Sequence, residues 1–485
     1  MNLLIKNALL INEGKRFKAD VLIEGERIKE ITSRQEPPQR SVIPRLTRDI
    51  LKKDPNNYWI ADQSCNDMTE TTVLDASGLL LLPGIIDDQV HFREPGLTHK
   101  GDIYSESRAA VAGGVTSFMD MPNTIPQTIT VQALNDKFDR ASKQSFANYT
   151  FFIGATNDNI EELKKEGAKR ATAIKVFMGA STGNMLVDNE QSLERIFSET
   201  GRIVVVHCEC EKTIAANKAR IIKQFGEELD VTFHPKIRDA AACYNSSSHA
   251  VELAKKYNTR LHLYHLSTEK EMSLLEVKPL NEKRITAEVC VHHLWFSDED
   301  YAEKGNQIKW NPAIKSRSDR DALRQALIEG KIDIVATDHA PHTWEEKQGA
   351  CLKAASGGPM VQHSLTAMLE LCRQGVFTEE LVVEKMAHAP AELFGIKDRG
   401  FIREGYYADL VLVNPNAPWT VSKDNLLYKC GWSPMEGVTF SHSVEKTFVN
   451  GRLVYDNGVF DEEYKGKELE RVFNILPHLK EKDTE

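Results

Sequence analysis

The sequence predicts an α/β protein: a (β/α)8 barrel of the TIM type, joined to a composite β-sandwich domain built from both termini. Three observations lead to this prediction. Eight short apolar segments rich in β-branched residues recur between residues 82 and 339. Amphipathic stretches with helical periodicity lie between most of them. Both ends of the chain instead alternate apolar and polar residues, as antiparallel strands do.

The apolar segments have the near-continuous hydrophobicity of strands that are covered on both faces. Helices are predicted between them, for example over residues 130–144, 159–167 and 318–330. Strands that alternate with helices indicate a parallel sheet, and eight such units close it into a barrel. The strand segments are, in chain order, PGIIDDQVHF, GVTSFMDM, NYTFFIGA, TAIKVFM, RIVVVHC, RLHLYHL, RITAEVCVHH and KIDIVATDH.

These patterns divide the chain into parts. Residues 82–397 are predicted to form the barrel, and residues 1–81 and 398–465 together form the composite β-sandwich. The segment 34–73 carries several prolines and many charges, which predicts a surface excursion or a small helical insert. Residues 466–485 are predicted to be a C-terminal helix with a charged tail.

The composition narrows the classes of partner. The chain has 61 basic and 71 acidic residues, and its net charge of −10 argues against a nucleic-acid partner. No apolar run approaches the ~20 residues of a membrane-spanning helix, so no membrane partner is expected. The eight cysteines are scattered without a paired spacing, which favours a reducing cytoplasm.

Side chains that can bind a metal fall at the ends of the predicted strands. In a barrel of this type, active-site residues come from the carboxyl ends of different strands and meet at one mouth. Imidazole and carboxylate groups are ligands of borderline and hard divalent metals. The candidates are His91, Lys175, His207, His265 and Asp338.

Three of these candidates have competing interpretations. A lysine inside TAIKVFM is costly to bury, so Lys175 either pairs with a carboxylate or reacts with CO2 to form an anionic carbamate that bridges two metals. Asp338 either binds a metal and acts as a base, or caps a helix or forms a salt bridge. His262 and His265 should face opposite sides of one strand, so only His265 is predicted to point into the barrel.

The first barrel strand ends in polar residues at every second position: Asp87, Gln89, His91 and Arg93. Alternate residues of a strand project to one face, so these four should lie together. A metal site would place two histidines at this spacing, but the chain has glutamine at the first position. A glutamine carbonyl can bind a divalent ion, although it is a more familiar ligand for hard ions than for zinc.

Several motifs in combination resemble the dihydroorotases, cyclic amidohydrolases of the amidohydrolase superfamily. The resemblance spans residues 1–33 and about 74–460. It implies the barrel with the composite β-sandwich, and the reversible hydrolysis of dihydroorotate to N-carbamoyl-L-aspartate in pyrimidine synthesis. The motifs are FREPG, MPNT, IKVFMGASTG, VVVHCE, LYHLST, KWNPAIKS and ATDHAPH.

The resemblance also implies roles and partners. It implies one or two divalent metals, most commonly zinc, and a small-molecule substrate. A homodimer is expected separately, as the commonest default oligomer. The metal set would be His91, the carboxylated Lys175, His207, His265 and Asp338, with Asp338 as the catalytic base and Gln89 at the position of the first histidine. The substrate would be held by Arg93, Asn123, Asn311 and His342.

The departure at Gln89 leaves the outcome open. Gln89 binds the metal directly, holds a water on it, or leaves that site weak. An active dihydroorotase is the first hypothesis, because the rest of the set is present. The others are a non-catalytic scaffold subunit, with 34–73 as a docking surface, and a hydantoinase or allantoinase. Arg93 favours an acidic substrate, because its planar fork suits a carboxylate.

Overall fold

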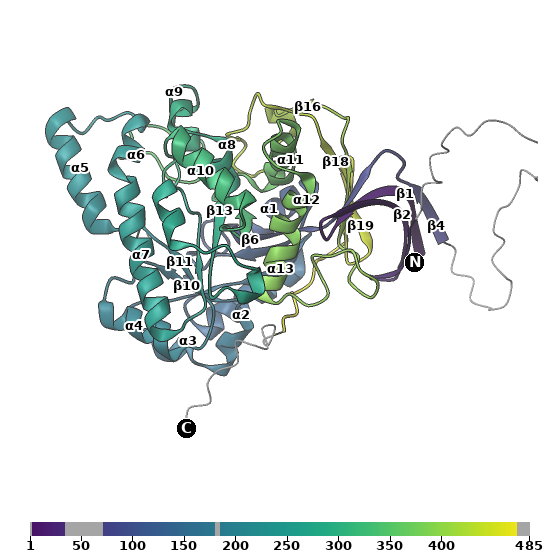
Figure 1. Cartoon of the computed structure of the whole chain (residues 1–485), viewed down its shortest axis with the longest axis horizontal. Helices are drawn as coiled ribbons and strands as arrows, with labels where there is room; N and C mark the ends of the chain where they lie inside the picture. Colours follow the sequence, from purple (N-terminus) through teal and green to yellow (C-terminus); the bar gives the residue numbers. More distant parts are fainter. Residues whose placement is uncertain (1, 34–70, 180–184, 473–485) are drawn as a thin grey trace, which may run out of the picture.

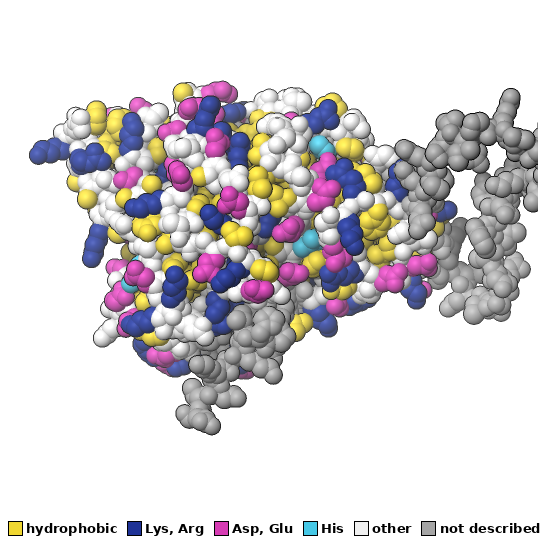
Figure 2. Space-filling view, viewed as in Figure 1, with side chains coloured by type: hydrophobic (Ala, Val, Ile, Leu, Met, Phe, Trp, Pro, Cys, Tyr) yellow, Lys and Arg dark blue, Asp and Glu magenta, His cyan; other side chains and the backbone are white. Residues whose placement is uncertain are grey.

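The computed structural model describes residues 2–33, 71–179 and 185–472, and its two parts lie side by side in Figure 1. Helices surround one part, and a curled sheet made of strands from both ends of the chain forms the other. Figure 2 shows acidic and basic side chains interspersed over one face of the molecule. Of the helices in the described ranges, none is both long and apolar enough to cross a membrane.

The predicted barrel is confirmed. Its strands are parallel and buried, and they run β6–β7–β8 and then β9 through β14 without a change of order. Val90 pairs with His339, and the His91 N–H donates to the His339 carbonyl at 2.7 Å, so the first strand meets the last. The strands are β6 (Ile85–Val90), β7 (Val115–Asp120), β8 (Asn148–Phe151), β9 (Ile153–Gly154), β10 (Ile174–Phe177), β11 (Val204–His207), β12 (Leu261–Leu263), β13 (Ile285–Cys290) and β14 (Ile334–Ala336).

Helices pack around the barrel, and their starts follow local sequence signals. The helix expected over 130–144 begins after Thr130, whose hydroxyl accepts from the Ala133 N–H at 3.1 Å. The helix expected over 159–167 is shorter than predicted. The α-helices are α1 (Ile103–Ala112), α2 (Val131–Gln144), α3 (Ile160–Leu163), α4 (Glu190–Glu199), α5 (Glu211–Phe225), α6 (His234–Ile237), α7 (Ala240–Tyr257), α8 (Val291–Trp295), α9 (Tyr301–Lys304), α10 (Arg317–Ile328), α11 (Ser364–Arg373), α12 (Glu379–Val383) and α13 (Ala389–Phe394).

The composite sheet interleaves strands from the two ends of the chain. Its order is β20-β19-β18-β15-β5-β1-β2-β3, with β4 paired to β1. The sheet curls, so that the Ala408 N–H donates to the Glu26 carbonyl at 2.9 Å across its open side. Its strands are β1 (Asn2–Asn12), β2 (Lys15–Glu24), β3 (Arg27–Ser33), β4 (Thr71–Asp75), β5 (Leu80–Pro83), β15 (Leu410–Asn414), β18 (Ser443–Val449), β19 (Arg452–Asp456) and β20 (Val459–Phe460), and β16 (Trp419–Thr420) and β17 (Thr439–Phe440) pair separately.

Two segment predictions need correction. Residues 71–73 belong to β4, which pairs in parallel with β1, so the predicted insert ends too late; residues 34–70 lie outside the described residues. Residues 466–472 are extended rather than helical, because the Leu469 N–H donates to the Tyr149 carbonyl at 2.9 Å beside β8. The rest of the predicted C-terminal helix lies outside the described residues.

A buried ion pair fixes α2 against the carboxyl ends of two barrel strands. The Lys137 Nζ lies 2.5 Å from Asp120 Oδ2, and both side chains are fully buried. The same lysine donates to the Met121 carbonyl at 2.6 Å, and Asp120 Oδ1 accepts from the Phe92 N–H at 2.8 Å. Asp120 therefore joins the end of β6, the end of β7 and α2.

We expect Asp120→Ala to lower the free energy of unfolding by about 3–5 kcal/mol, because it leaves the Lys137 ammonium buried without its counter-charge. Denaturant unfolding followed by circular dichroism measures the loss. The double variant Asp120→Leu/Lys137→Met should recover most of it, since both charges are removed. If the single variant unfolds at the wild-type midpoint, the pair does not stabilise this junction.

Candidate active site

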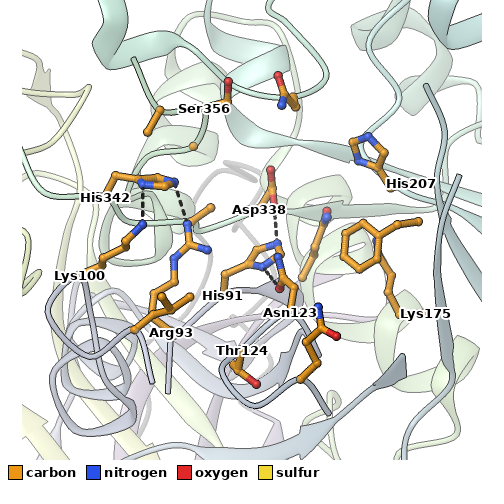
Figure 3. Close-up of a pocket in the computed structure, with 18 of the residues that line it drawn as sticks. His91, Arg93, Lys100, Asn123, Thr124, Lys175, His207, Asp338, His342 and Ser356 are labelled. Atoms are coloured by element: carbon orange, nitrogen blue, oxygen red, sulfur yellow. Dashed lines mark hydrogen bonds and ion pairs between the residues drawn. The ribbon is translucent and has the colours of Figure 1, made fainter. Parts of the chain in front are cut away.

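One cavity of about 830 Å3 opens at the carboxyl ends of the barrel strands. Figure 3 shows that its side chains converge from several strands and the loops that follow them. All of the predicted site residues line this cavity: Gln89, His91, Arg93, Asn123, Lys175, His207, His265, Asn311, Asp338 and His342. The barrel thus brings together residues that are far apart in the sequence.

Three of these residues sit in left-handed backbone conformations. The φ angles are 69° at Arg93, 41° at His265 and 43° at Asp338. Such angles cost a non-glycine residue roughly 1–2 kcal/mol, and they cluster at functional sites. β12 ends at Leu263, and the chain then bends at His265. The prediction that His262 and His265 face opposite sides of one strand is therefore wrong. His262 also faces the barrel interior, where its ring packs against Tyr264 at a centroid distance of 5.3 Å.

His91 and Asp338 form a pair in the middle of the cavity (Figure 3). The His91 Nε2 lies 3.0 Å from Asp338 Oδ1, and the His91 Nδ1 lies 2.8 Å from Asn123 Oδ1. Asn123 follows β7, so it fixes the ring of a residue that follows β6. The Oδ1 of Asp338 and the Nε2 of His91, which follow two different strands, therefore lie next to each other in the cavity.

His207 and His265 form a second pair. The His207 Nδ1 lies 2.9 Å from His265 Nε2, while the His207 Nε2–H donates to Glu209 at 3.0 Å. Burial lowers the pKa of both histidines, so both are neutral at pH 7. With its proton held on Nε2, His207 directs its Nδ1 lone pair toward His265, as two ligands of one cation would be placed.

Glu209 stays ionised in spite of its burial. Burial would raise the pKa of its carboxyl, but Arg238 and His207 outweigh that effect and lower it to about 2. The Arg238 guanidinium donates to the same oxygen, Oε2, that accepts from His207. Glu209 and Arg238 therefore orient the His207 ring, and Arg238 also lines the cavity.

Lys175 is buried in β10, and burial lowers its pKa to about 8, so a substantial part of the amine is neutral near pH 8. Its Nζ lies 4.0 Å from the centroid of the Tyr264 ring. Within the described ranges it makes no direct ion pair with a carboxylate, although Glu288 and Asp338 attract its charge from a longer distance. A partly neutral lysine that faces a cavity is nucleophilic toward CO2.

Gln89 and Asn311 present amide groups to the cavity. The Gln89 side chain is 1% exposed, and its carbonyl oxygen lies 3.7 Å from the Cys290 thiol, a weak donor. The Oδ1 of Asn311 is buried and has no hydrogen-bond partner among the described residues. An unpaired buried acceptor in a cavity wall is suited to a ligand donor.

Cationic side chains line the opposite side of the cavity from Lys175 and His207 (Figure 3). Arg93 donates through Nε to the Pro341 carbonyl at 3.0 Å, and its Nη2 lies 3.2 Å from His342 Nε2. The Lys100 Nζ lies 3.2 Å from His342 Nδ1 and 3.0 Å from Glu346. Burial lowers the pKa of His342 far below its usual range, so Arg93 and Lys100 carry the positive charge.

Sequence reasoning did not identify Lys100 or Arg238. Both lie in loops, which carry no hydrophobic periodicity to place a side chain. Lys100 lies in the loop after the first strand, seven residues beyond Arg93. This closeness in the sequence was the one feature that could have indicated it as a site residue. Arg238 lies just before α7 and gave no signal beyond its charge.

Comparisons with known proteins identify the family and the fold. The amidohydrolase family model matches residues 80–454. A dihydroorotase of Methanosarcina acetivorans is 33% identical over 378 residues, covering 76% of this chain and 80% of the relative. An allantoinase of Bacillus velezensis is 30% identical over 398 residues, covering 81% of this chain and 87% of the relative. The solved L-hydantoinase (dihydropyrimidinase) of Arthrobacter aurescens matches with a TM-score of 0.84 at 25% identity, covering 97% of this chain and 99% of that one.

Since Glu209 fixes the tautomer of His207, we expect Glu209→Gln to weaken divalent-metal binding about 10- to 100-fold. Zinc affinity measured by competition with a chromogenic chelator tests this. Glu271→Gln is the matched control, because Glu271 is an equally buried acid whose oxygens accept from Ser247 and Thr268. Equal zinc affinity in both variants would show that Glu209 does not orient a ligand.

Proposed function

The chain belongs to the amidohydrolase family, and we propose that it is a dihydroorotase, a hydrolase of cyclic amides. The reaction is the reversible hydrolysis of (S)-dihydroorotate to N-carbamoyl-L-aspartate in pyrimidine biosynthesis. The observation that carries the proposal is the division of the cavity: cationic side chains on one side, and a set of histidine, lysine and aspartate side chains on the other. A cyclic amide that also bears a carboxylate fits both sides.

We propose that Arg93 and Asn123 hold the substrate carboxylate, with help from His342, and that Asn311 contacts the ring. Arg93 is buried, which strengthens a charge-assisted hydrogen bond to a carboxylate. Its left-handed backbone turns the side chain toward the cavity. Lys100 adds a second positive charge next to His342. A neutral ring such as hydantoin or dihydrouracil offers Arg93 no carboxylate to bind, whereas Lys100 keeps its ion pair with Glu346.

The residues present fit a divalent metal. His91, Lys175, His207, His265 and Asp338 would hold it, and the ion is most commonly zinc. The support is the pair of neutral imidazoles that face each other at 2.9 Å and the His91–Asp338 pair at 3.0 Å. When bound, the metal acidifies the attacking water and polarises the ring carbonyl.

Asp338 is the proposed base. It accepts a proton from the attacking water as the carbon–oxygen bond forms, and it returns that proton to the ring nitrogen as the amide carbon–nitrogen bond breaks. Its neighbour His91 is held by Asn123, so the carboxylate keeps one orientation throughout. The reverse sequence closes the ring and releases water.

Gln89 modifies this site without removing it. The other ligand candidates line the cavity together, and the Gln89 carbonyl already faces a weak donor, Cys290. Because a neutral amide is a weaker ligand than imidazole for zinc, we infer that the metal next to His91 is bound less tightly than the one next to His207. A cavity that keeps every other ligand candidate supports an active enzyme rather than a scaffold.

A hydantoinase or allantoinase is the second candidate, favoured by the fold of the L-hydantoinase and by the allantoinase relative. The charge of the substrate separates the two candidates. We further infer a homodimer in the cytoplasm. The support is that two-fold dimers are the commonest assemblies, and that the cysteines of the described ranges are free thiols.

We expect purified protein to turn over dihydroorotate in preference to dihydrouracil, hydantoin and allantoin. Arg93→Ala should lower kcat/KM for dihydroorotate about 10- to 100-fold, the loss of a charge-assisted hydrogen bond of about 1.5–3 kcal/mol. Its activity on the neutral rings, measured in the same assay, should be unchanged and serves as the control. A preference for a neutral ring that survives Arg93→Ala would assign the hydantoinase or allantoinase function instead.

We expect native mass spectrometry of protein kept under CO2 to show an added mass of about 44 Da, the mass of CO2, on Lys175. The low pKa of Lys175 leaves neutral amine for this reaction. Lys175→Ala should lack the added mass and should retain less metal. A metal-loaded, active wild-type sample without the added mass would exclude the carbamate.

A further inference from the structure

Three polar side chains meet in the barrel interior, between Tyr264 and helix α13, and the proposed reaction uses none of them. Asp88 lies on β6, His262 on β12 and Glu288 on β13, and each is 0% exposed. The His262 ring centroid lies 5.3 Å from that of Tyr264 and 5.8 Å from that of Phe394 on α13. This cluster shares no residue with the cavity lining.

Four buried polar atoms of this cluster have no hydrogen-bond partner among the described residues, except that Asp88 and Glu288 can bond to each other by sharing a proton. They are Oδ1 and Oδ2 of Asp88, Nε2 of His262 and Oε2 of Glu288. Two carboxylates buried in an apolar layer cost several kcal/mol each unless a positive charge compensates them, and Lys175 attracts Glu288 without forming an ion pair with it. The four atoms therefore require a proton or a cation.

The distances within the cluster favour a cation. The His262 Nε2 lies 3.6 Å from Asp88 Oδ2 and 3.6 Å from Glu288 Oε2, and the ligand atoms of all three residues lie within 4.8 Å of one another. These separations are too long for hydrogen bonds. They approach the ~3.4 Å edge of a tetrahedron around a cation with bonds of about 2.1 Å.

Neighbouring groups hold the histidine and the glutamate in ligand orientations. The Thr286 hydroxyl has one proton, and when it donates that proton to the Leu261 carbonyl at 3.2 Å, it accepts from the His262 Nδ1–H at 2.8 Å. The Nε2 lone pair of His262 therefore points at the carboxylates. Glu288 uses its other oxygen, Oε1, to accept from the His265 N–H at 3.1 Å. Outer hydrogen bonds of this kind accompany metal-binding histidines and carboxylates.

We propose that Asp88, His262 and Glu288 bind a divalent cation of the zinc class, with both oxygens of Asp88 as ligands. The four unpartnered atoms then supply four donors, and the two negative charges balance the ion. Because Glu288 also holds the backbone of His265, the ion fixes the left-handed bend that carries His265 into the cavity. The site is structural, and it stands whether or not the chain hydrolyses dihydroorotate.

Zinc content tests the proposal on the full-length protein. Wild type, Asp88→Asn, His262→Phe and the control Glu271→Gln are loaded with Zn2+, dialysed against metal-free buffer and analysed by mass spectrometry of the metal. We expect the first two variants to hold one zinc fewer per chain than wild type and to unfold at a lower temperature. Glu271→Gln should hold as much zinc as wild type. Unchanged zinc with a raised melting temperature in Asp88→Asn would overturn the proposal, because it would show a proton shared between Asp88 and Glu288.

Wild-type crystals soaked in Zn2+ test the site without any substitution, so a folding defect in a variant cannot affect the result. Anomalous scattering at the zinc edge should place a peak between Asp88, His262 and Glu288, separate from any peak at His207 and His265. A map with zinc at His207 and His265 alone would refute the deeper site. The peak positions also separate this proposal from the proposed function, since either site can be present without the other.

Discussion

The closure of the barrel between β6 and the end of β14 is the constraint on which the rest of the structure depends. One backbone hydrogen bond of 2.7 Å, from the His91 N–H to the His339 carbonyl, marks the seam. It sets His91 beside Asp338, although the two residues come from the first and last strands. A parallel sheet left open at this seam would place them at opposite edges, and the central pair of the cavity would not exist.

Closure also sets a condition on the charged groups that are buried in and around the barrel. The walls exclude water, so each buried charge must be offset by a neighbour from another strand. Asp120 is offset by Lys137, and Glu209 by Arg238 and His207. Lys175 is offset less completely, and burial lowers its pKa to about 8. The lysine that we propose to react with CO2 is thus a position whose compensation is incomplete.

Much of this arrangement could be predicted from the sequence, because strand ends are set by short-range patterns. The positions of His91, His207 and Asp338 follow from one rule, that the carboxyl ends of barrel strands share a face. The orientation of His262 did not follow, because the bend at His265 breaks the alternation of β12. Lys100 and Arg238 could not be placed, because loops hold their side chains through tertiary contacts such as the ion pair of Lys100 with Glu346.

Residues 466–472 were predicted to be helical, and they are extended for a related reason. Their apolar spacing is typical of a helix, but they gain more from pairing beside β8 than a short isolated helix would gain. Arg170 also binds Glu468 through two nitrogens, at 3.0 and 2.7 Å. Long-range contacts of this kind outweigh the local preference for a helix. They cannot be predicted from the residues that are adjacent in the sequence.

The position of β5 has a consequence for how the chain can be divided. This strand lies between β1 and β15 in the sheet, and only Gly84 separates it from β6 in the barrel. A Cβ at Gly84 would lie 2.1 Å from Thr116 Oγ1, so the link admits no larger residue unless Thr116 or the backbone shifts. The sheet is therefore not a detachable module. Removing the terminal strands would take neighbours away from β5, which leads directly into Gln89, His91 and Arg93. Such a truncation should lower the activity as well as the stability.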